Sequence, residues 1–346
     1  MIRVFVVDDS ATVRGRLVEL VSEQADMVVC GQAANGRDAI EQIMRLKPDV
    51  ITLDLALPEI DGLGVTEHVM AVMPTPILIV SASFNRGEVF NTYEALSAGA
   101  VDVLDKSADA DDEWAQRFVS TVRIVSRIKV ITHPRGRLRT LAKQTTTASS
   151  TSVSRNRAEL VAIGASTGGP GAIVDVLAGM PKQFALPILV VLHVDASFAS
   201  SFADWLGQRS GRTVRIPNEG DLVADAGGQV LFAPPHRHLT IVGGRARLVD
   251  GPPRHHCKPS VDVLFESLAA DRGARTVAAL LTGMGRDGAA GLLAIRRAGG
   301  HTVAQDEMSS VVYGMPREAA LIGAADRILP LPEIGAALAL AAGGTE

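Results

Sequence analysis

The sequence has few aromatic residues, only two cysteines and no long apolar run. Of its 346 residues, 4% are aromatic and 47% are hydrophobic, so small aliphatic side chains must form most of the core. This composition favours parallel sheets, whose strands are buried on both faces. Cys30 and Cys257 cannot build a disulfide framework, which favours a reducing, cytoplasmic location.

Two further absences restrict the class of protein. No stretch approaches the ~18 apolar residues that cross a bilayer, and Asp8 and Asp9 interrupt the apolar N-terminus too early for a signal peptide. We therefore expect no direct membrane insertion. The net charge is −4, whereas binding to nucleic-acid phosphates requires clustered positive charge, so we expect no nucleic-acid partner.

Short apolar runs alternate with amphipathic stretches over residues 1–131, which we take as the first domain. The strands expected there are Ile2–Val7, Met27–Cys30, Val50–Leu53, Pro76–Val80 and Val101–Leu104. The helices expected there lie near 11–24, 36–46, 62–72, 87–97 and 111–130. Because no hairpin signal separates these units, they predict one parallel sheet with right-handed crossovers.

Residues 132–157 differ from both flanking regions. They lack apolar periodicity, and within them Gln144–Ser154 is almost wholly Gln, Thr, Ser and Ala, with basic residues on both sides. This composition predicts a flexible linker.

A second α/β pattern occupies residues 158–346. The strands expected there are Leu160–Ile163, Ile188–His193, Val214–Ile216, Gln229–Phe232, Leu239–Val242, Thr276–Leu281 and Thr302–Ala304. The helices expected there lie near 170–179, 197–209, 260–271, 287–298 and 315–322, with a final one from Ile334.

Polar side chains gather at the strand ends of the first domain. Asp8 and Asp9 follow its first strand, and Asp54 follows its third. Strand ends at one edge of an open parallel sheet converge on a ligand crevice, and three carboxylates there favour bound Mg²⁺. Lys106 and Ser81, at two further strand ends, can reach an added phosphoryl group. The alternative is a set of ordinary solvated loop residues, which this convergence disfavours.

The first domain resembles the receiver domain of bacterial response regulators. The residues that carry the resemblance are Val7-Asp8-Asp9-Ser10, Leu53-Asp54, Pro58, Asp61-Gly62, Ser81, Gly99-Ala100 and Lys106. It implies that Asp54 accepts a phosphoryl group from a histidine kinase, with Asp8 and Asp9 around Mg²⁺.

Three positions depart from the receiver pattern. Ser107 replaces the usual proline after the lysine, so the usual cis peptide is not expected. Val103 stands where receivers often have an aromatic residue, which argues against the usual aromatic switch. Ala56 has no side chain with which to steer a hydrolytic water, so the lifetime of the phosphoryl group cannot be predicted.

Gly164-Ala165-Ser166-Thr167-Gly168 has the G-x-S-x-G spacing between a predicted strand and a predicted helix. The glycines allow a tight turn that exposes the Ser166 hydroxyl, and N–H groups at the helix start can stabilise an oxyanion. A Gly-rich phosphate loop of a nucleotide-binding fold fits the isolated motif equally well.

Two further residues favour a nucleophilic serine. His193 ends the next strand, and adjacent parallel strands would bring it to Ser166 as a general base. Asp287 follows another strand and would orient the imidazole, although it could instead cap the next helix. The chain order Ser, His, Asp differs from that of α/β-hydrolases.

The second half resembles the chemotaxis protein-glutamate methylesterases. The residues that carry the resemblance are Ile163 to Pro170, Pro259 to Phe265, Leu281 to Gly285 and Asp287-Gly288. It implies a triad of Ser166, His193 and Asp287, with Thr167 in support and the Met284 N–H in the oxyanion hole. The implied reaction hydrolyses glutamate γ-methyl esters on a chemoreceptor's cytoplasmic helices, and many members also convert receptor glutamine to glutamate. No cofactor is implied for hydrolysis, and the unphosphorylated receiver is expected to cover the cleft.

The residues around His193 depart from this family. Leu192 and Val194-Asp195-Ala196 replace a glutamine and a Met-Pro-Pro-like stretch. We expect the loop that carries the base, and the receptor surface it meets, to differ accordingly.

The remaining histidines suggest a metal site at first sight. His236 and His238 are two residues apart, and His255-His256-Cys257 are consecutive, but no further ligands follow at zinc spacing. We expect His255, His256 and Lys258 to line the mouth of the cleft instead.

The sequence as a whole predicts two doubly wound parallel-sheet α/β domains, the first flavodoxin-like and the second Rossmann-like, joined by the linker. The function it favours is a phosphorylation-activated serine hydrolase. The competing hypothesis is a signalling adaptor whose second half binds a receptor or nucleotide, with Ser166 only a turn residue. A transcriptional regulator is disfavoured, because the chain has no helix-turn-helix signal or basic output domain.

Overall fold

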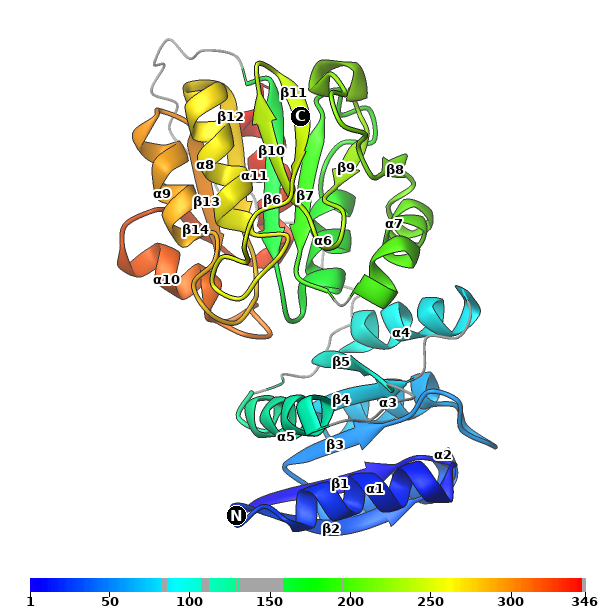
Figure 1. Ribbon diagram of the computed structural model, residues 1–346. Helices are drawn as coiled ribbons and strands as arrows, with labels where there is room; N and C mark the ends of the chain where they lie inside the picture. Colours follow the sequence, from blue (N-terminus) through cyan, green and yellow to red (C-terminus); the bar gives the residue numbers. More distant parts are fainter. Residues whose placement is uncertain (82–85, 107–111, 129, 131–157, 195, 344–346) are drawn as a thin grey trace.

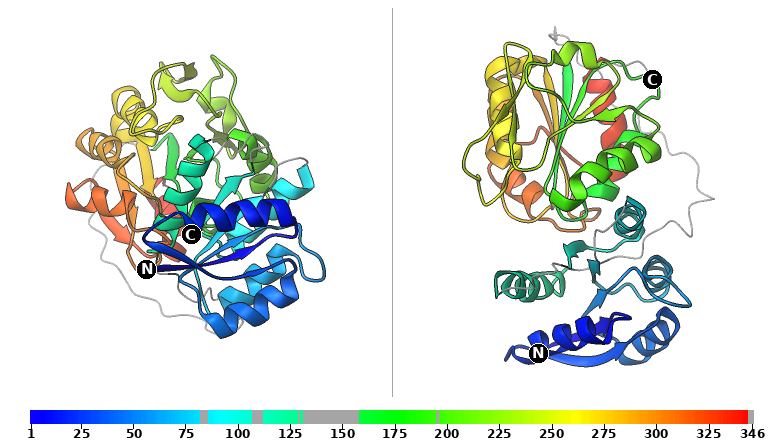
Figure 2. Two further views of the ribbon diagram at one scale, coloured as in Figure 1. Left: turned by 60° about the horizontal axis from the view of Figure 1, so that its bottom comes forward. Right: turned by 45° about the vertical axis from the view of Figure 1, so that its right-hand side comes forward.

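Two α/β domains lie one above the other in this computed structural model (Figures 1 and 2). The structure describes residues 1–81, 86–106, 112–128, 130, 158–194 and 196–343. The predicted linker over 132–157 and the predictions for Ser107 and Asp195 lie outside these ranges. None of the described helices is long and apolar enough to cross a membrane.

The first domain has a five-stranded parallel sheet in the order β2-β1-β3-β4-β5, as predicted. Its strands are β1 (Ile2–Val7), β2 (Met27–Ala33), β3 (Val50–Leu53), β4 (Ile77–Ser81) and β5 (Asp102–Asp105). Its helices are α1 (Ala11–Ser22), α2 (Gly36–Leu46), α3 (Gly62–Val72), α4 (Arg86–Ala98) and α5 (Asp112–Val125). The last helix ends at Val125 rather than at residue 130 as predicted. Helices α1 and α5 cover one face of the sheet, and α2, α3 and α4 cover the other.

Local sequence explains where three of these helices begin. Ser10, Asn35 and Asp61 are the N-caps of α1, α2 and α3, and each side chain accepts a hydrogen bond from a backbone N–H of the first turn. Such caps satisfy N–H groups that have no partner within the helix. Local side chains therefore fix the starts of α1, α2 and α3.

The second domain has a seven-stranded parallel sheet in the order β14-β13-β12-β6-β7-β9-β8. Its strands are β6 (Leu160–Ala165), β7 (Ile188–Leu192), β8 (Val214–Arg215), β9 (Val230–Phe232), β12 (Thr276–Leu280), β13 (His301–Gln305) and β14 (Arg327–Leu329). Its helices are α6 (Gly169–Ala178), α7 (Ala196–Ser210), α8 (Val261–Asp271), α9 (Ala289–Arg297), α10 (Met315–Leu321) and α11 (Leu331–Ala341). Helices α6, α7 and α11 cover one face, and α8, α9 and α10 cover the other.

Two features of this domain correct the sequence prediction. The predicted strand Leu239–Val242 exists as β10 (His238–Val242), but it pairs with β11 (Arg245–Val249) in a separate antiparallel hairpin. The turn between them is Gly243-Gly244, with both glycines at positive φ, which is a hairpin signal that the sequence analysis missed. The three-residue edge strand β14 was also missed.

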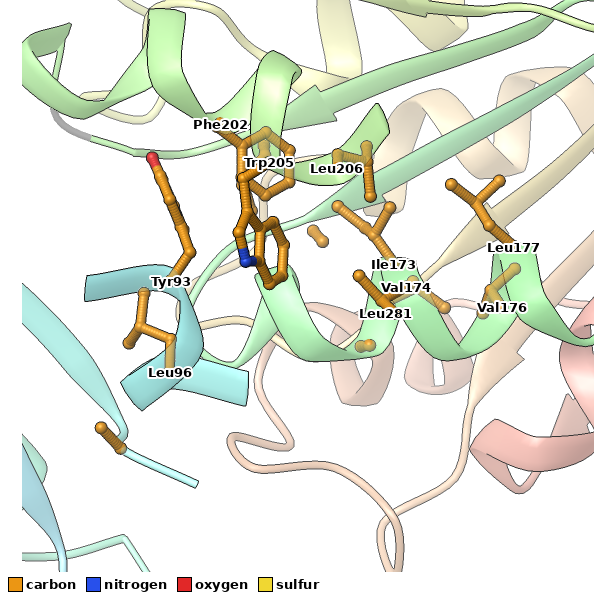
Figure 3. Packing of buried hydrophobic residues seen from close by; sticks show 14 of the residues in the cluster. Tyr93, Leu96, Ile173, Val174, Val176, Leu177, Phe202, Trp205, Leu206 and Leu281 are labelled. Atoms are coloured by element: carbon orange, nitrogen blue, oxygen red, sulfur yellow. The ribbon is translucent and has the colours of Figure 1, made fainter. Parts of the chain in front are cut away.

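Helix α4 of the first domain packs against α6 and α7 of the second. Tyr93 of α4 lies next to the aromatic side chains of α7 (Figure 3), and its ring centroid is 5.0 Å from that of Phe202 and 5.2 Å from that of Trp205. These residues belong to one hydrophobic cluster that continues from the first domain into the second. Through this contact the first domain covers the side of the second domain at α6 and α7.

Candidate active site and phosphorylation site

The predicted switch residues meet at one edge of the first sheet. Carboxylate oxygens of Asp8, Asp9 and Asp54 lie within 4.8 Å of one another. Lys106 Nζ is 2.8 Å from Asp8 Oδ2 and 2.8 Å from Asp54 Oδ2. Ser81 is buried on the adjacent strand, and its carbonyl accepts the N–H of Lys106.

The charges of this edge suit a hard cation. Burial raises the pKa of Asp8 above its usual range, Asp54 adds repulsion, and Lys106 only partly offsets them. Three carboxylates with oxygen donors alone are the ligand set that Mg²⁺ prefers. Asp8, Asp9 and Asp54 therefore fit a magnesium site.

Ser166 follows β6 on a tight turn into α6. The N–H of Gly169 donates to the carbonyl of Ser166 over 2.7 Å. Gly168, the N-cap of α6, has φ +76°, and a Cβ there would lie 2.5 Å from Val311 Cβ. Only glycine fits such a position, because it combines a left-handed backbone with close packing. The turn leaves Ser166 partly exposed at the sheet edge.

His193 follows β7, the neighbour of β6. Its N–H donates to the carbonyl of Ala165 over 3.1 Å, so the histidine starts beside the serine turn. Its side chain is only 14% exposed, and its Nε2 lies 2.9 Å from Asp287 Oδ2. The predicted base and the predicted acid are therefore in contact.

Asp287 is held by the start of α8. Its Oδ1 accepts from Ser260 Oγ at 2.7 Å and from the N–H of Asp262 at 3.1 Å, while its Oδ2 accepts from the N–H of Val261 at 2.7 Å. Burial alone would raise the pKa of Asp287, but the contact with His193 and these donors hold it below its usual value.

The structure excludes the alternative prediction that Asp287 caps the next helix. Helix α9 begins at Ala289 with Gly288 as its N-cap, so Asp287 does not cap it. The carboxylate instead lies at the positive end of α8, where backbone N–H groups favour negative charge.

The other ring nitrogen of His193 faces a cysteine. Nδ1 lies 3.5 Å from Cys257 Sγ. Within the described part of the chain, no hydrogen bond joins Ser166 to His193. Burial by itself lowers the pKa of His193, but the hydrogen bonds to Asp287 and Cys257 outweigh burial and raise it to about 9. A histidine with this pKa is protonated at neutral pH and cannot accept the proton of Ser166. In this arrangement His193 is therefore paired with Asp287 and Cys257 rather than with Ser166.

Ser166 and His193 nevertheless share one cavity of about 330 Å³. The second domain also lines it with Thr167, Cys257 and other residues, while the first domain contributes Leu96, Val101, Asp102, Val103, Arg117 and Thr121. The first domain thus forms one wall of the cavity that contains the predicted nucleophile and base.

Thr167 connects the two domains at this cavity. Its hydroxyl donates to Asp102 Oδ2 over 3.4 Å, and its carbonyl accepts from Thr282 Oγ1 at 3.0 Å. Burial raises the pKa of Asp102 to about 6. Asp102 was not among the predicted site residues, because nothing in its local sequence distinguishes it.

The segment that contains Met284 passes close to Ser166. A Cβ on Gly283 would lie 2.7 Å from Ser166 Cβ, so a larger residue there would collide with the serine. The Met284 side chain is 40% exposed and lines a second cavity of about 580 Å³ with Arg286 and Glu318. Gly283, the residue before Met284, is thus packed against the serine, while Met284 lines the second cavity.

Of the other histidines, His238 is structural, while His255 and His256 line cavities. His238 is buried, with Nε2 at 3.0 Å from the carbonyl of Pro252 and Nδ1 accepting the N–H of Ser260. His256 and Lys258 line the first cavity, and His255 and His256 line the second, as expected for the cleft mouth.

Two residues near the triad were assigned no part in it from the sequence. Ser260 was visible only as the first residue of the predicted helix 260–271 and as a member of the Pro259–Phe265 run. Cys257 attracted attention only as a metal-like residue. Their contacts with Asp287 and His193 depend on segments that are distant in the chain.

Comparisons with known proteins agree with this organisation. The family model described as CheB methylesterase matches residues 161–338, and the response regulator receiver domain matches residues 4–115. A protein-glutamate methylesterase/protein-glutamine glutaminase 2 of Anaeromyxobacter dehalogenans (strain 2CP-C) is 44% identical over 339 residues, which are 97% of this chain and 96% of that protein. A protein of the same name from Xanthomonas oryzae pv. oryzae (strain MAFF 311018) is 42% identical over 344 residues, covering 96% of this chain and 95% of that protein.

A solved structure covers the second domain. The crystal structure of the Thermotoga maritima CheB methylesterase catalytic domain is 34% identical and covers 52% of this chain and 97% of that chain, with a TM-score of 0.49. The matches to the family models and to the two full-length relatives decide the assignment: the chain belongs to the CheB methylesterase family, with a response regulator receiver domain before its methylesterase domain.

Proposed function

We propose that this protein is a serine hydrolase that demethylates glutamate γ-methyl esters on chemoreceptors and is activated by phosphorylation. Its products would be glutamate and methanol, and it would also deamidate receptor glutamine, in line with the names of its relatives. The observation that carries the proposal is that Ser166 and His193, which follow adjacent strands, line one cavity, while His193 Nε2 contacts Asp287.

Hydrolysis would follow the logic of a Ser-His-Asp triad. Ser166 Oγ attacks the ester carbonyl while His193 takes its proton, and the Met284 N–H stabilises the oxyanion, with Thr167 supporting the site. His193 then protonates the leaving methoxide, and water releases glutamate from the acyl-enzyme by the same route. The active form needs neutral His193 with Nδ1 facing Ser166, while Nε2 stays on Asp287.

Phosphorylation of Asp54 would control access to this site. Asp8, Asp9 and Asp54 would hold Mg²⁺, which offsets the charge of the phosphoryl group, while Lys106 and Ser81 would contact that group. Lys106 directly follows β5, whose Asp102 and Val103 line the catalytic cavity. A shift of β5 toward the phosphoryl group would weaken the receiver's cover, and a coupling of ~1–3 kcal/mol would suffice.

The remaining assignments follow from this role. We place the receiver at 1–131, the linker at 132–157 and the methylesterase domain at 158–346. The phosphodonor would be the histidine kinase of the chemotaxis system, and the substrate would be the cytoplasmic domain of a methyl-accepting chemoreceptor. A cytoplasmic location is supported by free Cys30 and Cys257.

The test is methanol release from methylated receptor with and without a small phosphodonor. The wild type should release methanol and respond to the phosphodonor. Ser166→Ala should lose hydrolysis but keep phosphotransfer to Asp54, which serves as its folding control. Asp54→Asn should keep basal hydrolysis and lose the response. Undiminished hydrolysis by Ser166→Ala would refute the assignment of the nucleophile, and no hydrolysis by the phosphorylated wild type would favour an adaptor.

A further inference from the structure

A second potential nucleophile shares the proposed base. Cys257 Sγ lies 3.5 Å from His193 Nδ1, and His193 Nε2 lies 2.9 Å from Asp287 Oδ2. Thiol, imidazole and carboxylate therefore follow one another in the order that activates nucleophilic cysteines. An adjacent imidazolium favours the thiolate, which is the reactive form of a cysteine.

The thiol can be reached while the receiver is in place. Cys257 is partly exposed and lines both cavities of the site. The second cavity, of about 580 Å³, is lined by Met284, Arg286, Glu318 and their neighbours and by no described residue of the receiver. A small molecule can therefore approach the sulfur from the side that the receiver leaves open.

Modification of this thiol would disturb the proposed hydrolysis directly. Nδ1 is the nitrogen that must turn to Ser166 in the active form. A group attached to Cys257 Sγ would occupy the space beside Nδ1 in the cavity that also contains Ser166. The serine would then lose its base although the His193–Asp287 contact remained.

We propose that Cys257 is a modification site for small soft electrophiles, and that its modification switches the esterase off. In the reaction with an alkyl halide, the thiolate sulfur attacks carbon, the S–C bond forms, the C–halogen bond breaks, and halide leaves with its electron pair. His193 keeps its own proton throughout this step. The inhibitory part of this proposal rests on the proposed function, whereas the reactivity of the thiol does not.

The chain contains a matched control for reactivity. Cys30, in β2, is also a partly exposed free cysteine. Burial raises the pKa of Cys30, and the charged groups near it are Arg3 and Asp49 rather than a histidine. The two cysteines can be compared within one sample.

The first experiment measures alkylation of the full-length, unphosphorylated protein by iodoacetamide, with mass spectrometry of the two cysteine peptides. Cys257 should be labelled at least about tenfold faster than Cys30. Asp287→Asn should slow the labelling of Cys257 and leave that of Cys30 unchanged. Equal rates at the two cysteines, or a Cys257 rate that does not respond to Asp287→Asn, would overturn the proposal.

The second experiment measures ester hydrolysis before and after labelling, each variant against its own untreated rate. The wild type and Cys30→Ser should lose activity in proportion to labelling of Cys257, whereas treated Cys257→Ser should retain its untreated rate. Full activity of the labelled wild type, or equal inhibition of Cys257→Ser, would refute the inhibitory role. Absence of hydrolysis before treatment would instead refute the proposed function, and the labelling rates would still decide the reactivity of Cys257.

Discussion

The protonation state of His193 decides whether the described arrangement can catalyse hydrolysis. Its pKa of about 9 leaves on the order of one molecule in a hundred with a neutral ring at pH 7. The raised pKa also links to stability, because a histidine that binds its proton more tightly when folded stabilises the fold at low pH. This stabilisation is fully present below about pH 6.5 and is lost as the pH rises through about 9.

We predict a steep pH profile for the unphosphorylated protein. Because only neutral His193 can accept a proton, kcat/KM should rise about tenfold per pH unit from pH 7 and level off near pH 9. Methanol release at a series of pH values measures this. His236→Asn, which changes an exposed histidine whose φ of +61° asparagine tolerates, should show the same profile. A profile that is flat between pH 7 and 9 would contradict the assignment of the base.

At the scale of elements, the start of α8 positions Asp287, the proposed triad acid. Ser260 caps α8 by accepting the N–H of Val263, and it donates its own hydroxyl to Asp287. One side chain thus begins a helix and orients the carboxylate that holds His193. We regard Ser260 as a positioning residue, since it acts through Asp287 rather than on the substrate.

We predict that Ser260→Ala lowers kcat with little change in KM. Loss of a hydrogen bond to a buried carboxylate costs about 1.5–3 kcal/mol, which corresponds to on the order of tenfold or more in kcat. Steady-state kinetics and thermal denaturation measure the two effects, and Ser260→Thr should restore most of kcat.

A variant that loses a helix cap far from the site serves as the control, because it should lower stability without affecting catalysis. Asn35→Ala removes the N-cap of α2 in the receiver and should cost about 1 kcal/mol of stability without lowering kcat. If Ser260→Ala affected only stability, as Asn35→Ala should, the positioning role would be wrong.

At the scale of the whole molecule, helix α4 holds the receiver on the catalytic domain. Glu94 accepts from Trp205 Nε1 at 2.9 Å and pairs with Arg209 at 2.8 Å, while the Tyr93 hydroxyl donates to the carbonyl of Phe198 at 2.9 Å. These polar contacts surround the aromatic cluster shown in Figure 3. They belong to the same interface whose other part closes the catalytic cavity.

We predict that Glu94→Ala raises the hydrolysis rate of the unphosphorylated protein. Loss of the hydrogen bond and the partly exposed ion pair should weaken the closed arrangement by about 1 kcal/mol, or roughly fivefold in rate. The phosphorylated rate should change little. Glu19→Ala, which removes an ion pair with Arg16 on α1, should leave both rates unchanged. An unaltered ratio of phosphorylated to unphosphorylated rate in Glu94→Ala would argue against the role of this contact.

Much of the receiver and of its switch could be predicted because the signals are local. Each strand is a short apolar run, and parallel pairing brings the strand ends to one edge, so Asp8, Asp54 and Lys106 meet without further information. The same argument places His193 beside the Ser166 turn, since β6 and β7 are neighbours. The Gly243-Gly244 hairpin was also local, and its omission was an error in reading a signal that was present.

The sequence by itself determined the two α/β domains, their order and the residues that bring chemistry to the sheet edges. Only the tertiary structure decided that Asp287 lies on the start of α8, that Nδ1 of His193 faces Cys257, and that Asp102 of the receiver contacts Thr167. The physical reason is the separation along the chain of the residues that interact. Strand periodicity and turn chemistry depend on a few neighbouring residues. The orientation of the His193 imidazole and the position of the Asp287 carboxylate depend instead on residues from distant segments that pack together.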